Sequence, residues 1–167
     1  MGEETFIVKP IGVIRSPFTQ AEGTPIQPSL AEGATGIVEV FPEYAEGLQD
    51  LKGFERIWLI YWFDRSCELK LKVIPFRDTK ERGVFATRAP CRPNKIGLSS
   101  VRLLDIKGSI LKVADIDILD GTPLLDIKPY VPRFDIYQGA RSGWLERDGN
   151  DLTRADRRFT SDNDTDL

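Results

Sequence analysis

The chain lacks histidine altogether and has only two cysteines among its 167 residues. Without histidine, a Ser-His-Asp triad, a Cys-His pair and a histidine-ligated zinc site are excluded, whatever the fold. Cys67 and Cys91 stand in unrelated sequence contexts, so the pattern predicts neither a disulfide framework nor a thiolate metal site. Any catalysis must therefore use other residue types, and no metal is expected.

Long apolar runs are missing as well. The longest, from Ile57 to Phe63, is far below the roughly 20 residues that cross a bilayer, and no charged-then-apolar leader precedes it. No Gly-rich dinucleotide turn or P-loop occurs, so the usual nucleotide-binding folds have no support. We expect a soluble, cytoplasmic protein without membrane contact.

Short strand-like segments dominate what is present. They are rich in β-branched or aromatic residues, with Gly or Pro nearby, and their spacing predicts a mainly β protein built as a single antiparallel β-barrel with short helices. One ordinary core fits this length, so we expect a barrel domain over residues 5–149, with a peripheral C-terminal segment at residues 141–145 that docks onto it, and a polar, weakly ordered tail over 150–167. The expected strands cover residues 5–8 and 11–14 (one interrupted strand), 36–41, 56–63, 83–87, 101–106 and 110–119, with a helix over 43–50.

Charge is segregated along the chain. Residues 56–112 carry 13 Lys/Arg and 5 Asp/Glu, whereas the remainder carries 10 and 21, giving the net −3. A basic zone in an acidic protein can attract a polyanion such as RNA. The alternative, which we weigh equally, is that the two kinds of segment neutralise each other on folding.

Residues 83–100, which read GVFATRAPCRPNKIGLSS, are the most informative stretch. Pro90 and Pro93 fix the backbone between Arg88, Arg92 and Asn94. Two guanidiniums in a rigid frame suit a phosphate, a carboxylate or a stacked base. From spacing alone, a surface loop with solvated arginines is the favoured interpretation.

This stretch resembles the F-A-T-R-x-P-x-R-P-N-x-I-G-L-S signature of the TsaA/TrmO-like (YaeB-like) family. Residues 11–18, 53–63 and 120–130 resemble further motifs of that family, and the resemblance extends from about Phe6 to Pro132. It implies a β-barrel methyltransferase that uses S-adenosyl-L-methionine. The implied substrate is N6 of threonylcarbamoyladenosine beside the anticodon of a tRNA, and the implied assembly is a homodimer.

The resemblance also implies site residues. Arg88 would bind the methionine carboxylate, and Leu98 would cover the adenine. Relatives often carry histidine where Arg56 and Asp64 stand here, which changes one corner of the site. The cofactor-binding set carried over from the family is Pro25, Gln27, Asp64, Arg65, Arg88, Leu98, Leu119, Asp120, Gly121 and Thr122.

For catalysis we expect Asp126, Lys128, Tyr130 and Asn94. Asp126 and Lys128 share one strand face, so a solvated salt bridge competes with a catalytic role. Residues 120–123, D-G-T-P, read first of all as a turn. Arg15, Arg92 and Lys95 are expected to contact RNA or substrate, with a structural role as the alternative for Arg92.

Two other functions compete with the enzyme. One is a noncatalytic β-barrel RNA-binding module that uses the basic zone. The other is a regulatory protein that binds the cofactor without transferring its methyl group. Affinity for S-adenosylmethionine separates the RNA module from the other two.

Overall fold

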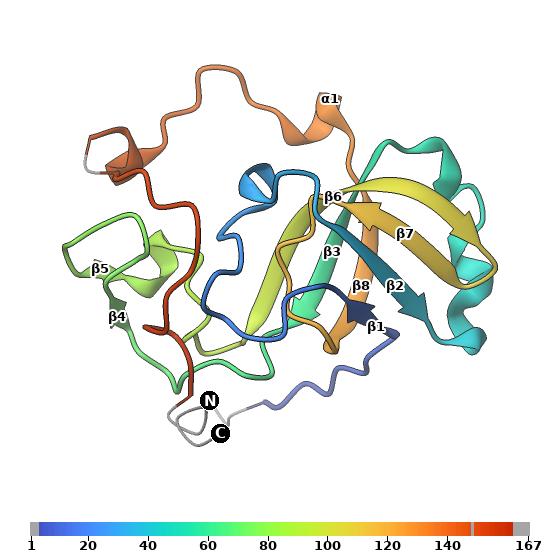
Figure 1. Ribbon diagram of the computed structural model, residues 1–167, viewed down its shortest axis with the longest axis horizontal. Helices are drawn as coiled ribbons and strands as arrows, with labels where there is room; N and C mark the ends of the chain where they lie inside the picture. The colour runs from blue at the N-terminus through green and yellow to red at the C-terminus, as the bar shows by residue number, and fades with distance from the viewer. Residues whose placement is uncertain (1–3, 148, 162–167) are drawn as a thin grey trace.

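A computed structural model of the chain describes residues 4–147 and 149–161. Six strands form a closed barrel in the order β1-β2-β7-β6-β3-β8, and every neighbouring pair is antiparallel (Figure 1). The mainly β, antiparallel barrel expected from the sequence is therefore confirmed. The barrel strands are β1 (Gly12–Arg15), β2 (Thr35–Val40), β3 (Arg56–Trp62), β6 (Ile96–Lys107), β7 (Ile110–Ala114) and β8 (Thr122–Pro129).

The barrel interior follows from alternation along the strands. In β3, Ile57, Leu59 and Tyr61 are buried, while Trp58 and Ile60 point outward and are half-buried. Successive side chains of a strand lie on opposite faces of the sheet, so this pattern assigns one face to the core. The interior is filled mainly by aliphatic residues from all six strands and from the segment that follows β7.

The short helices are almost all 3-10 turns. The helix expected over residues 43–50 is such a turn, and Pro42 lies at its start. The bounds are η1 (Pro28–Leu30), η2 (Pro42–Leu48), η3 (Leu51–Gly53), η4 (Val84–Ala86), α1 (Pro132–Asp135) and η5 (Gly143–Glu146).

Three strand predictions were wrong in detail. Residues 5–8 have no regular structure and are exposed. Only Arg82–Gly83 (β5) is a strand near the predicted 83–87, because Val84–Ala86 forms η4. Strand β7 ends at Ala114 instead of 119, because Asp115 has φ +63, which an extended strand does not allow.

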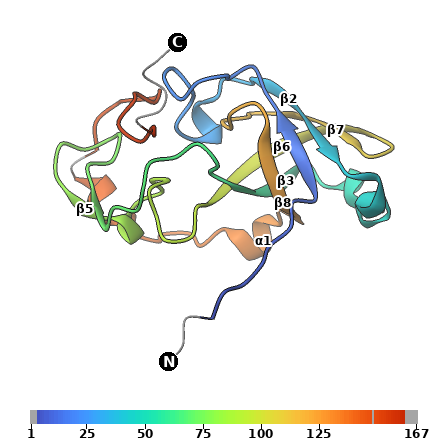
Figure 2. The same ribbon diagram turned by 90° about the horizontal axis from the view of Figure 1, so that it is seen from below.

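A smaller lobe lies beside the barrel. It contains the two-stranded sheet of β4 (Lys72–Val73) and β5, together with a second apolar cluster that includes Val73, Ala89 and Phe159. Figure 2 shows this lobe at the end of the molecule opposite the β2–β7 side of the barrel. No helix within residues 4–147 and 149–161 is long and apolar enough to span a membrane.

The described part of the expected tail packs onto the rest of the chain. Arg154 forms a β-bridge with Pro25, and Thr160 forms one with Ser66. Phe159 is 8% exposed and its ring lies 4.9 Å from that of Phe76. Residues 150–161 thus contact the segment before η1 and the loop after β3, and residues 162–167 of the predicted tail lie outside the described part.

Candidate functional site

A cavity of about 350 Å³ lies between the mouth of the barrel and the smaller lobe. Its wall includes Tyr61 and Gly97 from β3 and β6, and Phe76 and Phe159 from the lobe. Of the ten residues predicted to bind the cofactor, only Asp120 and Gly121 are not part of the wall. The predicted residues that line the cavity are Pro25, Gln27, Asp64, Arg65, Arg88, Leu98, Leu119 and Thr122.

Asp120 and Gly121 form the turn that precedes β8. The Asp120 carboxylate accepts a hydrogen bond from the Ser16 amide at 3.1 Å, and Gly121 has φ +79, a conformation that favours glycine. Arg65 donates to the Asp120 carbonyl oxygen at 2.7 Å and to the Thr122 hydroxyl at 3.2 Å. This turn is the one predicted from the sequence, and Arg65 ties it to the loop after β3.

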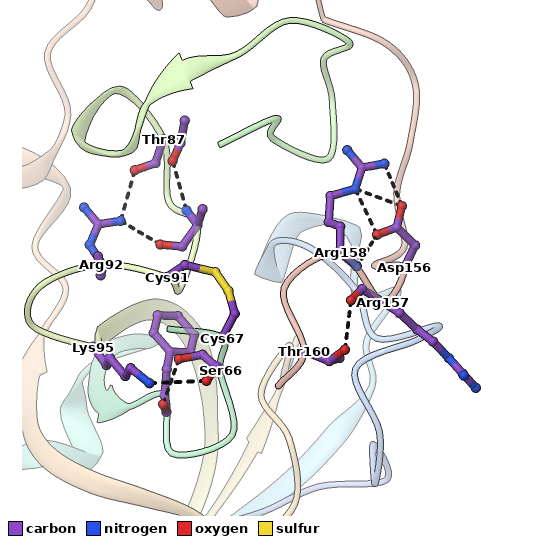
Figure 3. The surroundings of a disulfide bond; sticks show 12 residues. Ser66, Cys67, Thr87, Cys91, Arg92, Lys95, Asp156, Arg157, Arg158 and Thr160 are labelled. Atoms are coloured by element: carbon purple, nitrogen blue, oxygen red, sulfur yellow. Dashed lines mark hydrogen bonds and ion pairs between the residues drawn. A yellow bond between two sulfur atoms is a disulfide. The ribbon is translucent and has the colours of Figure 1, made fainter. Parts of the chain in front are cut away.

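The two arginines of the 88–92 loop have different partners. Arg88 is exposed at the cavity, and its Nη1 donates to Gln27 Oε1 at 2.5 Å. Arg92 donates to the carbonyl oxygens of Thr87 at 3.2 Å and Ala89 at 2.9 Å (Figure 3). Arg92 therefore holds the shape of its own loop, and a contact with RNA or substrate stays a prediction.

Cys67 and Cys91 form a disulfide bond, which overturns the expectation that the two cysteines are unrelated (Figure 3). Their Cα atoms are 5.2 Å apart across a separation of 24 residues. The bond joins the loop after β3, which carries Asp64 and Arg65, to the loop that carries Arg88. It thereby fixes two walls of the cavity relative to each other.

A cluster of buried polar side chains lies at the cavity. The Tyr61 hydroxyl and Ser99 Oγ are 3.0 Å apart, and both residues are buried. Burial raises the pKa of Tyr61 well above its ordinary range, and the nearby Asp117 carboxylate raises it further. A Cβ on Gly97 would collide with the Tyr61 ring, so glycine at 97 allows the ring to lie against β6.

Asp117 completes this group. It lines the cavity, and its Oδ1 is buried without a hydrogen-bond partner among the described residues. Burial raises the pKa of Asp117 to about 7, although Ser99 and Arg88 lower it in part. Sequence analysis missed Asp117 as a site residue. The alternation of Ile116 and Ile118 with acidic residues was the available signal, but it gave no indication that a cavity lies beside the carboxylate.

Three of the four predicted catalytic residues lie on the outer face of the barrel or at its edge, and the fourth, Asn94, lies in the loop before β6. Asp126 pairs across strands with Ile60, and Lys128 pairs with Trp58. The two charged side chains form an ion pair of 2.9 Å, and the Tyr130 and Trp58 ring centroids are 5.4 Å apart. Neither these three residues nor Asn94 line the cavity, so their catalytic roles stay predictions.

The other two residues predicted to contact RNA or substrate, Arg15 and Lys95, interact with residues of the chain itself. Arg15 pairs with Glu39 at 3.3 Å, and Lys95 donates to the Ser66 carbonyl oxygen at 3.2 Å. Asp64 pairs with Arg65 at 3.4 Å, and Arg56 lies 3.0 Å from the Asp115 carboxylate.

Residues 13–136 match the family model described as the tRNA-methyltransferase O N-terminal domain. The chain belongs to the TrmO family. A Pyrococcus abyssi protein named a probable S-adenosyl-L-methionine-binding protein is 54% identical over 155 residues, which cover 92% of this chain and 84% of the relative. A mouse tRNA (adenine(37)-N6)-methyltransferase is 36% identical over 136 residues, which cover 77% of this chain and 32% of that enzyme.

The TrmO fold is also seen in a solved structure. The crystal structure of TrmO from Pseudomonas aeruginosa superposes with a TM-score of 0.71 at 42% identity. The match covers 84% of this chain and 62% of the Pseudomonas chain. The matched part of the chain thus corresponds to about three fifths of the Pseudomonas protein.

Proposed function

We propose that this TrmO-family chain binds S-adenosyl-L-methionine in the cavity and transfers its methyl group to N6 of threonylcarbamoyladenosine beside the anticodon of a tRNA. The observation that carries the proposal is the wall of the cavity. Distant segments of the chain bring together eight of the ten residues implied by the family motifs. The names of the Pyrococcus and mouse relatives support the cofactor and the reaction.

The cavity fits such a ligand in size and chemistry. Its volume of about 350 Å³ falls within the range of small-molecule sites. Apolar groups such as Leu98 and Phe63 suit the adenine, and the Arg88 guanidinium suits a carboxylate. The buried, unpartnered Asp117 oxygen calls for a hydrogen-bond donor that a ligand can supply.

The acceptor nitrogen would be positioned by residues on the outer face of the barrel. Leu98, Ile60 and Asp126 lie in one row across β6, β3 and β8. Neighbouring strands are about 4.8 Å apart, so Asp126 lies about 10 Å from the Leu98 rim of the cavity. When bound, the cofactor supplies an electrophilic methyl group. Alignment by the chain supplies much of the acceleration, and Asp126 accepts the proton that the N6 nitrogen loses.

The same outer face supports the proposed homodimer. Ile96 and Leu98 on β6 are 45% and 48% exposed, and the outward residues Trp58, Ile60 and Trp62 on β3 adjoin them. A contiguous apolar surface of this kind favours association with another protein surface.

Basic residues of the central segment support tRNA binding, although two of them, Arg56 and Arg102, pair with Asp115.

Calorimetric titration and a methylation assay test the proposal. We expect saturable binding of S-adenosylmethionine and methyl incorporation into tRNA that contains threonylcarbamoyladenosine, with none into tRNA that lacks this modification. Binding without incorporation would instead support a regulatory cofactor-binding protein. The absence of saturable binding would contradict both functions and leave the RNA-binding module.

Asp126→Asn tests the proton acceptor. We expect single-turnover methylation to fall roughly 100-fold, because general-base contributions are typically of this size. Cofactor affinity should not change, since Asp126 does not line the cavity. A near-native rate would show that the proton leaves to water, and Asp126 would then be a surface residue of β8.

A further inference from the structure

Asp117 reaches the cavity because the chain leaves the barrel after β7. Asp115 has φ +63, and the following residues cross the barrel mouth, where Ile116 and Ile118 are buried in the core. Ser99 on β6 points inward opposite Leu59. Asp117 is thereby held beside Ser99 and Tyr61, and its Oδ1 remains without a hydrogen-bond partner within the described residues.

The arginines near Asp117 donate hydrogen bonds to other residues, so a cationic ligand group can bind the Asp117 carboxylate. Arg88 is near enough to act electrostatically on Asp117 and Tyr61, but its Nη1 is hydrogen-bonded to Gln27. Arg65, on the same wall, donates to the Asp120 carbonyl oxygen and the Thr122 hydroxyl. The remaining carboxylates of the wall already have arginine partners: Asp64 pairs with Arg65, and Asp156 pairs with Arg158.

We propose that Asp117 recognises the α-ammonium group of S-adenosylmethionine: its Oδ1 accepts a hydrogen bond from the ammonium, beside the carboxylate that the family resemblance assigns to Arg88. This assignment rests on the proposed cofactor. An α-amino acid carries its two opposite charges on one carbon, so it suits a site where an arginine and a carboxylate line the same cavity. A buried carboxylate is stabilised far better by a cation than by the neutral amino group of adenine.

The protonation of Asp117 agrees with this role. Burial raises the pKa of its carboxyl to about 7 in the free protein, and an adjacent ammonium favours the ionised form. Ligand binding therefore releases a proton when the pH is below about 7. Affinity is expected to rise as the pH rises toward about 7 and to fall again above roughly pH 8, where the α-ammonium of the ligand loses its proton.

Three ligands test the assignment by calorimetry: S-adenosylhomocysteine, its desamino analogue and methylthioadenosine, which lacks the whole amino-acid group. The wild-type protein should bind S-adenosylhomocysteine about 10- to 100-fold more tightly than the desamino analogue, as expected for one charge-assisted hydrogen bond. Asp117→Asn should abolish this preference and leave affinity for methylthioadenosine unchanged. As a control, Asp156→Asn should retain the preference, because Asp156 lines the same wall but already pairs with Arg158.

Each other outcome is decisive. If the wild-type protein binds the desamino analogue as tightly as S-adenosylhomocysteine, the ammonium contact is excluded, and this arm needs no variant that folds. If Asp117→Asn still binds S-adenosylhomocysteine more tightly than the desamino analogue, Asp117 does not contact the ammonium. The same follows if its affinities for S-adenosylhomocysteine and methylthioadenosine fall by the same factor. If the wild-type protein binds neither S-adenosylmethionine nor S-adenosylhomocysteine, the proposed cofactor itself is wrong.

Discussion

The barrel and the smaller lobe are stabilised in different ways. Continuous antiparallel ladders close the barrel around an aliphatic core, whereas the lobe has one sheet of two short strands and a small apolar cluster. The lobe depends instead on links between distant segments, such as the Cys67–Cys91 bond and the Phe76–Phe159 ring contact. The cavity lies between the two, so one wall is built on a rigid scaffold and the other on cross-links.

The largest effect on stability is expected when a buried side chain of the barrel core is shortened. Leu59 is fully buried in β3, and Leu59→Ala should lower the free energy of unfolding by about 4 kcal/mol, as is typical for deletion of a buried leucine side chain. Urea denaturation followed by tryptophan fluorescence measures this. A loss below about 1 kcal/mol would mean that the barrel core repacks easily and is not the more rigid of the two regions.

Removal of the disulfide should loosen the lobe selectively. Cys67→Ser combined with Cys91→Ser opens a link between residues 24 apart, for which chain entropy predicts a loss of about 3 kcal/mol. Amide hydrogen exchange should increase in the lobe and remain low in β3 and β6. Uniform changes over both regions would show that they unfold as one unit.

Asp117→Asn should change how stability depends on pH. The folded pKa of about 7 lies above the ordinary 3.8, so the folded state retains a proton that the unfolded state has lost. This contribution to stability is complete below about pH 4 and disappears as the pH rises through 7. At pH 8 the ligand-free variant should therefore be more stable than the wild type, by at most about 4 kcal/mol, because each unit of pKa difference corresponds to about 1.4 kcal/mol.

Urea denaturation at pH 5 and pH 8 provides the comparison. The difference between variant and wild type should be smaller at pH 5, where the wild-type carboxyl still holds most of its proton. An equal difference at both values would mean that Asp117 ionises with an ordinary pKa in the folded protein.

The smallest effect is expected on the outer face of β8. Lys128 and Asp126 form an exposed ion pair, with 62% and 45% of the side chains accessible, and such pairs contribute less than about 1 kcal/mol. Lys128→Ala should leave the unfolding midpoint nearly unchanged. If methylation of tRNA falls while stability does not, the pair serves the reaction and not the barrel.

The difference between the regions also decided what the sequence could predict. β3 lies in a continuous apolar run rich in β-branched and aromatic residues, and several strand signals of this kind suffice to predict a barrel. They do not separate the buried Ile57, Leu59 and Tyr61 from their outward neighbours. The lobe has no comparable run. Its disulfide joins Cys67 to Cys91 through the fold alone, and Phe159 is buried although its sequence neighbours are polar.

The site shows the same division. The family motifs predicted eight of the residues that line the cavity, including Arg88, Leu98 and Thr122. They did not indicate Asp117, whose importance comes from burial of a single oxygen atom beside Tyr61 and Ser99. Burial of that kind depends on how the segment after β7 crosses the barrel mouth, which no short sequence pattern encodes.

Gly97 has a consequence for the shape of the ligand site. A Cβ at this position would collide with the Tyr61 ring, and both residues line the cavity. An alanine at 97 would therefore force the ring, and with it part of the cavity wall, to move. The shape of the ligand site thus depends on an absent methyl group on β6.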